Sequence, residues 1–247
     1  MALTRADAAS ANIEIVRSAQ RFRTRTGWLD SRHSFSFGAH YDPGNTHFGL
    51  LLVSNDDIVA PGAGFPAHPH RDMEIVTWVL GGALAHSDSA GRTGTVRAGL
   101  VQRMSAGTGI RHAELNARQD QPVRFVQMWV APDAAGVEPG YEQCDVAERL
   151  AGGDLIPLAS GRGHAGAATI GQRDAVLYAA RLLAGRTVPL PQAPFLHLYL
   201  ARGQVSLGEE RLGAGDAARI RGGSAPAVAA AGSGSSEILV WEMYSHL

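Results

Sequence analysis

The feature that most limits what this chain can fold into is the shortness of its apolar runs. Runs at residues 48–53, 74–80 and 124–130 are followed closely by Asn55-Asp-Asp, Gly81-Gly82 and Pro132-Asp. With 30 glycines and 12 prolines, such turn sequences recur along the whole chain. Many short strands joined by close turns are typical of a β-sandwich or β-barrel. We therefore predict an all-β fold, in which the best helical candidate is the short stretch 145–151.

A faint internal repeat divides the chain in two. Residues 77–84 resemble residues 198–205, and residues 96–104 resemble residues 212–220. Each pair reads as strands alternating with glycine turns, which is the pattern of a repeated structural unit. We predict two β-barrels of one design, residues 1–135 and 150–247. They would be joined near residues 135–155, where the composition is that of a linker.

The charge balance argues against a nucleic-acid-binding or membrane-surface protein. The net charge is −1 and the pI is about 6.8, so the chain has no global field that would attract polyanions. Basic residues cluster only near the start, as an exposed arm or alternatively as a phosphate-binding strip. This cluster comprises Arg17, Arg21, Arg23, Arg25 and Arg32.

Cysteine usage and hydropathy indicate a cytoplasmic protein. The single cysteine, Cys144, excludes an intrachain disulfide and fits a reducing compartment. Its polar surroundings predict an unreactive surface thiol. No apolar run approaches the length that spans a bilayer, and the first residues lack the apolar segment of a secretory signal.

Two pairs of potential metal ligands have the spacing of a β-strand. His68 and His70 are two residues apart, and so are His112 and Glu114. Positions i and i+2 of a strand point to the same face, so each pair can aim at one point. Two such strands facing each other across a barrel predict a site of three imidazoles and one carboxylate. That donor set suits iron, nickel, copper, manganese or zinc.

Other candidate residues leave alternatives open. Glu74 competes with Glu114 as the carboxylate ligand, although Glu114 shares the face of His112. If Glu74 is not a ligand, it is a hydrogen-bond acceptor behind the site or a partner of Arg71. The second half lacks the His-x-His pattern, so we expect one metal per chain, in the first barrel. There His197 lies in an apolar strand, which predicts a buried, hydrogen-bonded core histidine.

Five polar residues near the motif are expected at the surface. His33, His40 and His47 precede it, and the alternative is that they line the mouth of the barrel. His86 and Asp88 lie in a hairpin, where exposure to solvent is the usual state.

One stretch resembles the first cupin motif at every fixed position, with the pattern Gly62-x5-His68-x-His70-x3-Glu74-x6-Gly81. Another resembles the second motif, with the pattern Gly99-x5-Ser105-Ala-Gly107, then His112-x3-Asn116. Serine replaces the usual proline there, and two extra residues precede the histidine. These departures, together with Arg32-His-Ser-Phe-Ser-Phe-Gly and Met104-Ser-Ala-Gly-Thr-Gly-Ile-Arg, resemble the pirin family. The resemblance is dense over residues 27–132 and looser beyond.

Resemblance to pirins implies two cupin (jelly-roll-like) barrels in tandem, with one metal, usually iron, in the first. It implies the ligands His68, His70, His112 and Glu114, and it favours a monomer. Two activities are known in the family: several members are quercetin 2,3-dioxygenases, and the animal protein is an iron-dependent partner of transcription regulators.

We therefore expect a metal-dependent dioxygenase that cleaves flavonol-type phenols with dioxygen. A divalent ion with one carboxylate ligand keeps a net positive charge, which suits an anionic phenol. Glu114 is the first candidate for the catalytic base and Glu74 the second. The alternative is a metal- or redox-sensing regulatory protein that binds a protein partner without turnover, and a metal-free binding barrel is the third possibility.

Overall fold

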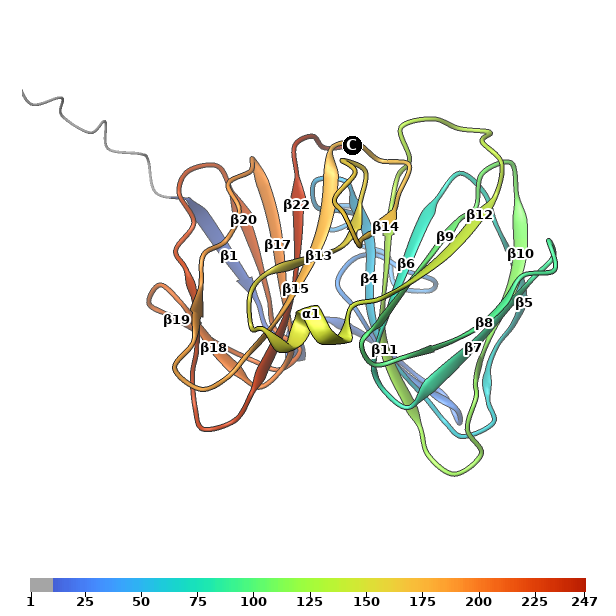
Figure 1. The fold of residues 1–247 in the computed structure, drawn as a ribbon, viewed down its shortest axis with the longest axis horizontal. Helices are drawn as coiled ribbons and strands as arrows, with labels where there is room; N and C mark the ends of the chain where they lie inside the picture. Colours follow the sequence, from blue (N-terminus) through green and yellow to red (C-terminus); the bar gives the residue numbers. More distant parts are fainter. Residues whose placement is uncertain (1–10) are drawn as a thin grey trace, which may run out of the picture.

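The computed structural model describes residues 11–247 and consists of two β-barrels side by side (Figure 1). Within these residues each barrel combines a seven-stranded sheet with a four-stranded sheet. The described helical elements are α1 (Ala147–Ala151), close to the predicted stretch, and the 3-10 turn η1 (Ser18–Gln20). The all-β, two-barrel prediction is thus confirmed. No described helix has the length and apolar character needed to cross a membrane.

The first barrel is antiparallel throughout. Its larger sheet has the order β12 (Gly140–Asp145), β9 (Leu100–Ser105), β6 (Glu74–Gly81), β11 (Val123–Val130), β4 (Leu51–Val59), β3 (Leu29–His33), β2 (Phe22–Arg25). Its smaller sheet has the order β5 (Gly64–His70), β10 (Ile110–Asn116), β7 (Ala83–Asp88), β8 (Thr93–Arg97).

The second barrel repeats this plan, with one parallel pair, β13 and β14. Its larger sheet has the order β1 (Asn12–Val16), β20 (Ala217–Arg221), β17 (Phe195–Arg202), β22 (Ser236–Met243), β15 (Ala175–Leu182), β13 (Ile156–Ser160), β14 (Ala168–Thr169). Its smaller sheet has the order β16 (Thr187–Val188), β21 (Val228–Ala230), β18 (Gln204–Leu207), β19 (Glu210–Gly213).

Strand pairing departs from the predicted domain limits of 1–135 and 150–247. Strand β1 belongs to the second barrel, where Ile13 is the register partner of Ile220. Ile13 and Ile15 pack on the aliphatic interior of that barrel, while Glu14 between them faces the arginines of β20. At the other limit, β12 extends the first barrel to Asp145 by pairing with β9. The first ten residues of the predicted first domain lie outside the described residues.

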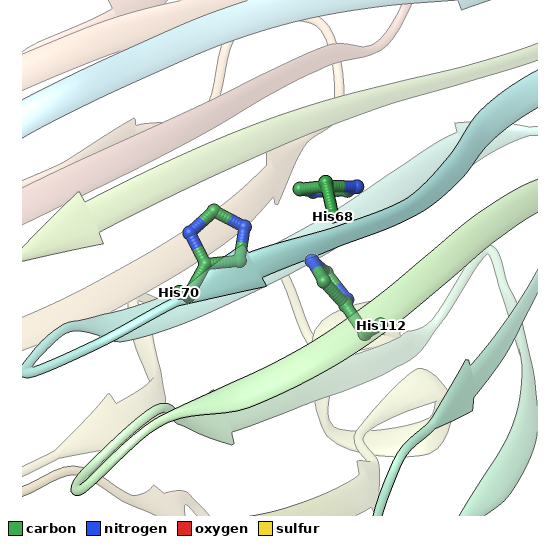
Figure 2. A group of neighbouring side chains, drawn as sticks. All are labelled: His68, His70 and His112. Carbon is green, nitrogen blue, oxygen red and sulfur yellow. The ribbon is translucent and has the colours of Figure 1, made fainter.

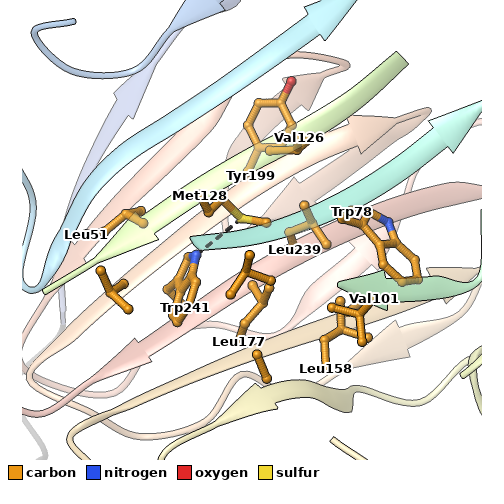
Figure 3. Packing of buried hydrophobic residues seen from close by; sticks show 14 of the residues in the cluster. Leu51, Trp78, Val101, Val126, Met128, Leu158, Leu177, Tyr199, Leu239 and Trp241 are labelled. Atoms are coloured by element: carbon orange, nitrogen blue, oxygen red, sulfur yellow. Dashed lines mark hydrogen bonds between the residues drawn. The ribbon is translucent and has the colours of Figure 1, made fainter. Parts of the chain in front are cut away.

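The largest apolar cluster lies between the two barrels (Figure 3). Val76 and Trp78 of β6 face it from the first barrel, and Leu177 and Trp241 face it from the second. The Trp241 indole N–H donates to the sulfur of Met128 across the interface at 3.3 Å. Each such side chain contributes about 1.5–3 kcal/mol when it is removed from water. The two barrels are therefore held together by a continuous core.

The predicted exposed arm of arginines is wrong for Arg21. Its guanidinium is buried and donates to backbone carbonyls of the first barrel, at Arg32 and Ser54, and to Gly215 O and Tyr199 Oη of the second. Buried polar groups need such partners, and Arg21 satisfies acceptors from both barrels at once. Arg17 is ion-paired with Glu210 and Asp216 of the second barrel.

The observed burial bears on the predictions for Cys144 and His197. Cys144 is half-buried on β12, where burial raises the pKa of its thiol and keeps it protonated. His197 is buried on the interface side of β17, against Phe35 and Phe48, as the core prediction requires. Its Nε2 has no hydrogen-bond partner among residues 11–247, so the predicted side-chain hydrogen bond is missing at that atom.

Candidate metal centre

Three histidines meet where β5 and β10 pair (Figure 2). His68 is the register partner of His112, and His70 follows on the same face of β5. The ring centroids lie 4.5 Å apart for His68 and His112, 4.8 Å for His68 and His70, and 4.9 Å for His70 and His112. One donor atom from each ring lies within 4.8 Å of the other two. The structure thus places His68 and His70 on one face of β5, as their spacing predicted, with His112 opposite them.

Glu114 follows His112 on the same face of β10, beside a bulge in the neighbouring strand β5. His112 pairs with His68 but Glu114 pairs with Phe65, so three steps along β5 match two along β10. A Cβ atom at Gly64 would lie 2.2 Å from the backbone oxygen of Glu114, so β10 can approach only a glycine there. The Glu114 carboxylate is buried, and its donor atom lies within 4.8 Å of those of His86 and His112. It therefore joins the histidines through His112.

The donor atoms of the cluster lack hydrogen-bond partners. Nε2 of His70, Nε2 of His112 and Oε1 of Glu114 are buried and unpaired among the described residues. Hydrogen bonds orient two of the predicted ligands: His68 Nδ1 lies 2.8 Å from the carbonyl of Pro66, and Glu114 Oε2 accepts from Gln127 Nε2 at 2.6 Å. A buried unpaired polar atom costs about 1–3 kcal/mol. Converging imidazole and carboxylate donors with free lone pairs fit a divalent transition metal.

His86 is part of this centre, and its predicted exposure is wrong. It is buried, its Nδ1 lies 3.4 Å from His112 Nδ1, and its Nε2 lies 3.5 Å from Asp88 Oδ2. If Asp88 accepts from His86 Nε2–H, then His86 Nδ1 accepts from His112 Nδ1–H. That order leaves the lone pair of His112 on Nε2, the unpaired atom. The sequence held the signal, because His86 and Asp88 also have strand spacing.

Burial sets the protonation of the cluster without a metal. Desolvation, assisted by the neighbouring imidazoles, lowers the pKa of His70 to about 4 and that of His112 to about 2. Burial raises the pKa of Glu114 to about 7. The two histidines are therefore neutral near neutral pH, which is the form that binds metals.

A cavity of about 430 Å³ opens beside the histidines. Small-molecule sites occupy about 300–1,000 Å³, so an aromatic ligand of modest size fits. Apolar groups form one part of its wall and polar groups of β2, β3 and β4 another. The lining includes Thr24, Leu29, Ser31, His33, Phe37, Asn55, Asp57, Phe65, His68, His70, Glu114, Gln127 and Trp129.

The three histidines that precede the motif lie in different places. His33 is buried in the cavity wall, so the preferred surface prediction is wrong and the alternative fits it. Half-buried His40 lies 3.3 Å from the hydroxyl of Thr24, a residue of the cavity wall. Half-buried His47 contacts a different surface hollow beside the second barrel.

Glu74 lies outside the cavity. Asp72 adopts a positive φ of 46° between β5 and β6, so the alternation that starts at His68 does not continue to Glu74. Its carboxylate accepts from Ser105 Oγ at 2.8 Å and faces Gly171 of the second barrel. Glu74 is thus a buried hydrogen-bond acceptor, but it is bonded to Ser105 rather than to a predicted metal ligand or to Arg71. Its predicted role as a base is corrected by this position, because a substrate in the cavity cannot reach it.

Comparison with known proteins accounts for both barrels. Residues 15–130 match the family model named Pirin, and residues 157–243 match the model of the quercetinase C-terminal cupin domain. A Mycobacterium tuberculosis protein, named as a candidate quercetin 2,3-dioxygenase, is 53% identical over 240 residues, covering 96% of this chain and 98% of that protein. A pirin-like protein of Caulobacter vibrioides is 42% identical over 197 residues, covering 79% of this chain and 84% of that protein.

A solved structure shares the fold. The bacterial pirin of Escherichia coli in complex with nickel(II) superposes with a TM-score of 0.86 at 33% identity, covering 94% of this chain and 100% of that one. With both barrels matched and a relative more than half identical along nearly the whole length, this chain belongs to the pirin family.

Proposed function

We propose that this protein is a metal-dependent dioxygenase that cleaves flavonol-type phenols. The metal would be held by His68, His70, His112 and Glu114 in a mononuclear site. The observation that carries the proposal is the meeting of His68, His70 and His112 beside a cavity of about 430 Å³, with Glu114 joined to them through His112. Relatives named as quercetin 2,3-dioxygenases support the choice of a flavonol and dioxygen as substrates.

Fe(II) is the metal we propose first, following the family resemblance. Nickel, manganese, copper and zinc suit the same donors, because selectivity among them depends on geometry and supply. The nickel(II) complex of the Escherichia coli relative fits that tolerance. When bound, a redox-active divalent metal would lower the pKa of a coordinating hydroxyl and allow electron transfer toward dioxygen.

The side chains around the metal position supply binding and orientation. Trp129 Nε1–H donates to Gln127 Oε1 at 3.1 Å, and Gln127 in turn donates to Glu114. These two hydrogen bonds fix the position of Glu114 Oε2. Trp129 also meets His70 edge to face, with centroids 4.8 Å apart, and together with Phe37 and Phe65 it gives the cavity an apolar wall. Such a wall excludes water and packs against a flat aromatic ligand.

Oxygen uptake with quercetin tests the proposal. Protein reconstituted with Fe(II) should consume dioxygen and quercetin together, whereas metal-free protein and the His70→Ala variant should do neither. Turnover by His70→Ala at the rate of the unaltered protein would sink the proposal. Bound metal without oxygen uptake would instead favour the regulatory alternative and direct the search to protein partners.

A further inference from the structure

The cavity contains a second buried carboxylate, Asp57, that the metal centre does not use. It lies on β4, directly across from Ser31 of β3, and it forms part of the cavity wall. Its side chain is 4% exposed, and Oδ1 has no hydrogen-bond partner among residues 11–247. Rotation about χ2, a broad torsion in aspartate, can present either oxygen to the cavity.

The neighbouring Asp56 shows how unusual this is. Asp56 points to the other face of β4, where Arg124 binds it in a two-pronged pair, with Nε 2.9 Å from Oδ1, and Tyr199 donates to it. No described ion pair reaches Asp57. Arg21, the nearest cation acting on it, donates instead to backbone carbonyls and Tyr199. A buried carboxylate that has an unpaired oxygen and no ion pair is costly unless a ligand or a proton completes it.

The groups that face Asp57 leave it as a weak acid. Burial raises its pKa to about 7, Ser31 and Arg21 oppose the rise, and the charge of Asp56 adds to it. Asp57 in turn raises the pKa of Glu114. The remaining neighbour on β3 is His33, whose pKa is lowered mainly by burial, so that it is neutral.

The other carboxylates near the site are committed elsewhere. Glu114 Oε2 accepts from Gln127, and one oxygen of this carboxylate lies within 4.8 Å of ring nitrogens of His86 and His112. Glu74 is outside the cavity, bonded to Ser105. Asp57 is therefore the uncommitted carboxylate in the wall of the cavity.

We propose that Asp57 is the catalytic base that removes the proton of the substrate's acidic hydroxyl, an assignment that rests on the proposed function. The O–H bond of the flavonol breaks, the electron pair stays on the ligand oxygen, and the proton forms a new O–H bond on Asp57. The product at Asp57 is a neutral carboxylic acid, which suits a desolvated site better than the charged form.

A chain of polar groups offers this proton a way out. Ser31, beside Asp57, has its hydroxyl 3.4 Å from His33 Nδ1. His33 Nε2 lies 2.9 Å from the hydroxyl of Thr24, which lies 3.3 Å from Nε2 of His40. Because His40 is only partly buried, the chain leads from the cavity wall toward solvent. Hydroxyls and neutral imidazoles both accept and donate, so the base can be regenerated through this chain.

The test separates proton removal from oxygen chemistry. Protein loaded with redox-inert Zn(II) would be mixed, without oxygen, with a flavonol that is neutral in free solution, and the absorbance shift of ligand ionisation would be followed in time. We expect Asp57→Asn and Asp57→Ala to slow ionisation by about 100-fold or more, the usual effect of losing a general base. Formate should restore part of the rate in Asp57→Ala, where it has room, and little in Asp57→Asn.

Glu74→Gln is the matched control, because Glu74 is a buried carboxylate on the far side of the same sheet. It should ionise the ligand as fast as the unaltered protein. Zinc content and melting temperature would show that each variant is folded and loaded. Independently of any variant, the ionisation rate of the unaltered protein should fall as the pH drops through the pKa of Asp57, because the protonated acid cannot accept.

Equal rates in both Asp57 variants and the unaltered protein would overturn the assignment. So would an equal loss in Glu74→Gln, a rate independent of pH, or a flavonol that binds without ionising. Rapid ionisation without oxygen uptake by the Fe(II) protein would sink the dioxygenase proposal while leaving Asp57 as the base. Equal oxygen uptake with and without Asp57 would overturn the assignment of Asp57 and leave the dioxygenase proposal standing.

Discussion

The interiors of the two barrels differ although their sheets follow one plan. In the first, the inward positions carry polar side chains such as Asp57, His112 and Glu114, and a cavity remains among them. In the second, the corresponding space is occupied by an aliphatic cluster that includes Leu198 and Ile220. The same architecture thus encloses a reactive cavity in one copy and a packed core in the other.

The difference teaches how the two roles are divided. Buried carboxylates with raised pKa values and unpaired donor atoms weaken the first barrel when it holds no ligand. The second barrel and the apolar interface supply the burial that offsets this weakness. Loss of the metal centre should remove the property that distinguishes the first barrel, and smaller changes should measure its separate contributions.

The largest effect is expected from His112→Ala. Removing a donor that lies in both groups of potential ligands should abolish metal binding under conditions where the unaltered protein is fully loaded. Competition against a chelator, with metal content measured directly, checks this. His164→Ala in the second barrel is the control and should bind metal normally. Equal affinity in both variants would mean that the metal lies elsewhere.

Truncating a side chain in each barrel should lower the free energy of unfolding more in the second barrel than in the first. Leu198→Ala opens a hole in the aliphatic cluster and should lower the free energy of unfolding by about 2–5 kcal/mol. Leu29→Ala, at a half-buried leucine in the wall of the existing cavity, should lower it by less than about 2 kcal/mol, because no new closed hole is formed. Denaturant titration of the metal-free protein measures both. Similar losses in the two variants would contradict the contrast between hollow and packed interiors.

His86 should tune the metal rather than hold it. His86→Gln removes the acceptor of His112 Nδ1–H and should weaken metal binding by about 10–100-fold, as is usual for groups that orient a ligand. The same chelator competition measures it. His33→Gln, in the cavity wall but unbonded to the cluster, is the control. A complete loss of metal in His86→Gln would make His86 a ligand instead.

The smallest effect concerns pH and the core histidine. Burial lowers the pKa of His197 from 6.5 to about 3, so below 6.5 the unfolded chain binds a proton that the folded chain does not. Stability present above that pH is therefore lost on acidification, by about 2 kcal/mol between pH 6.5 and about pH 5. His197→Leu should lack this share of the pH slope. Unfolding of the metal-free proteins at the two pH values compares them, and identical slopes would contradict the assignment.

The parts of the molecule that follow from local periodicity could be predicted. The spacing of two residues placed His68 and His70 on one face, and short apolar runs between glycine turns predicted the strands. The missing His-x-His pattern separated the second barrel from the first. Each of these depends on neighbours along the chain, which a sequence displays directly.

The parts that failed depend on contacts between distant segments. Exposure was expected for His86 from its hairpin, but pairing of β7 with β10 carries it inside. Arg21 is buried by acceptors from two barrels. Glu74 does not share the face of His70 because Asp72, between them, has a positive φ. Such a φ is uncommon for a residue other than glycine, so the sequence did not signal it. Asp57 was predicted in a turn, within Asn55-Asp-Asp, whereas β4 continues through it to Val59 and places it in the cavity wall.

The pairing of β1 with β20 affects how the protein folds during synthesis on the ribosome. Ile13 is synthesised about 200 residues before its partner Ile220, an interval of roughly 10–40 s of translation. During that interval the first barrel, complete at Asp145, can close on its own strands. The nascent second barrel cannot gain its edge strand β1 until residue 221 has been made. A chain whose synthesis stops before residue 221 therefore leaves β1 unpaired, with Ile13 and Ile15 exposed to chaperones and proteases.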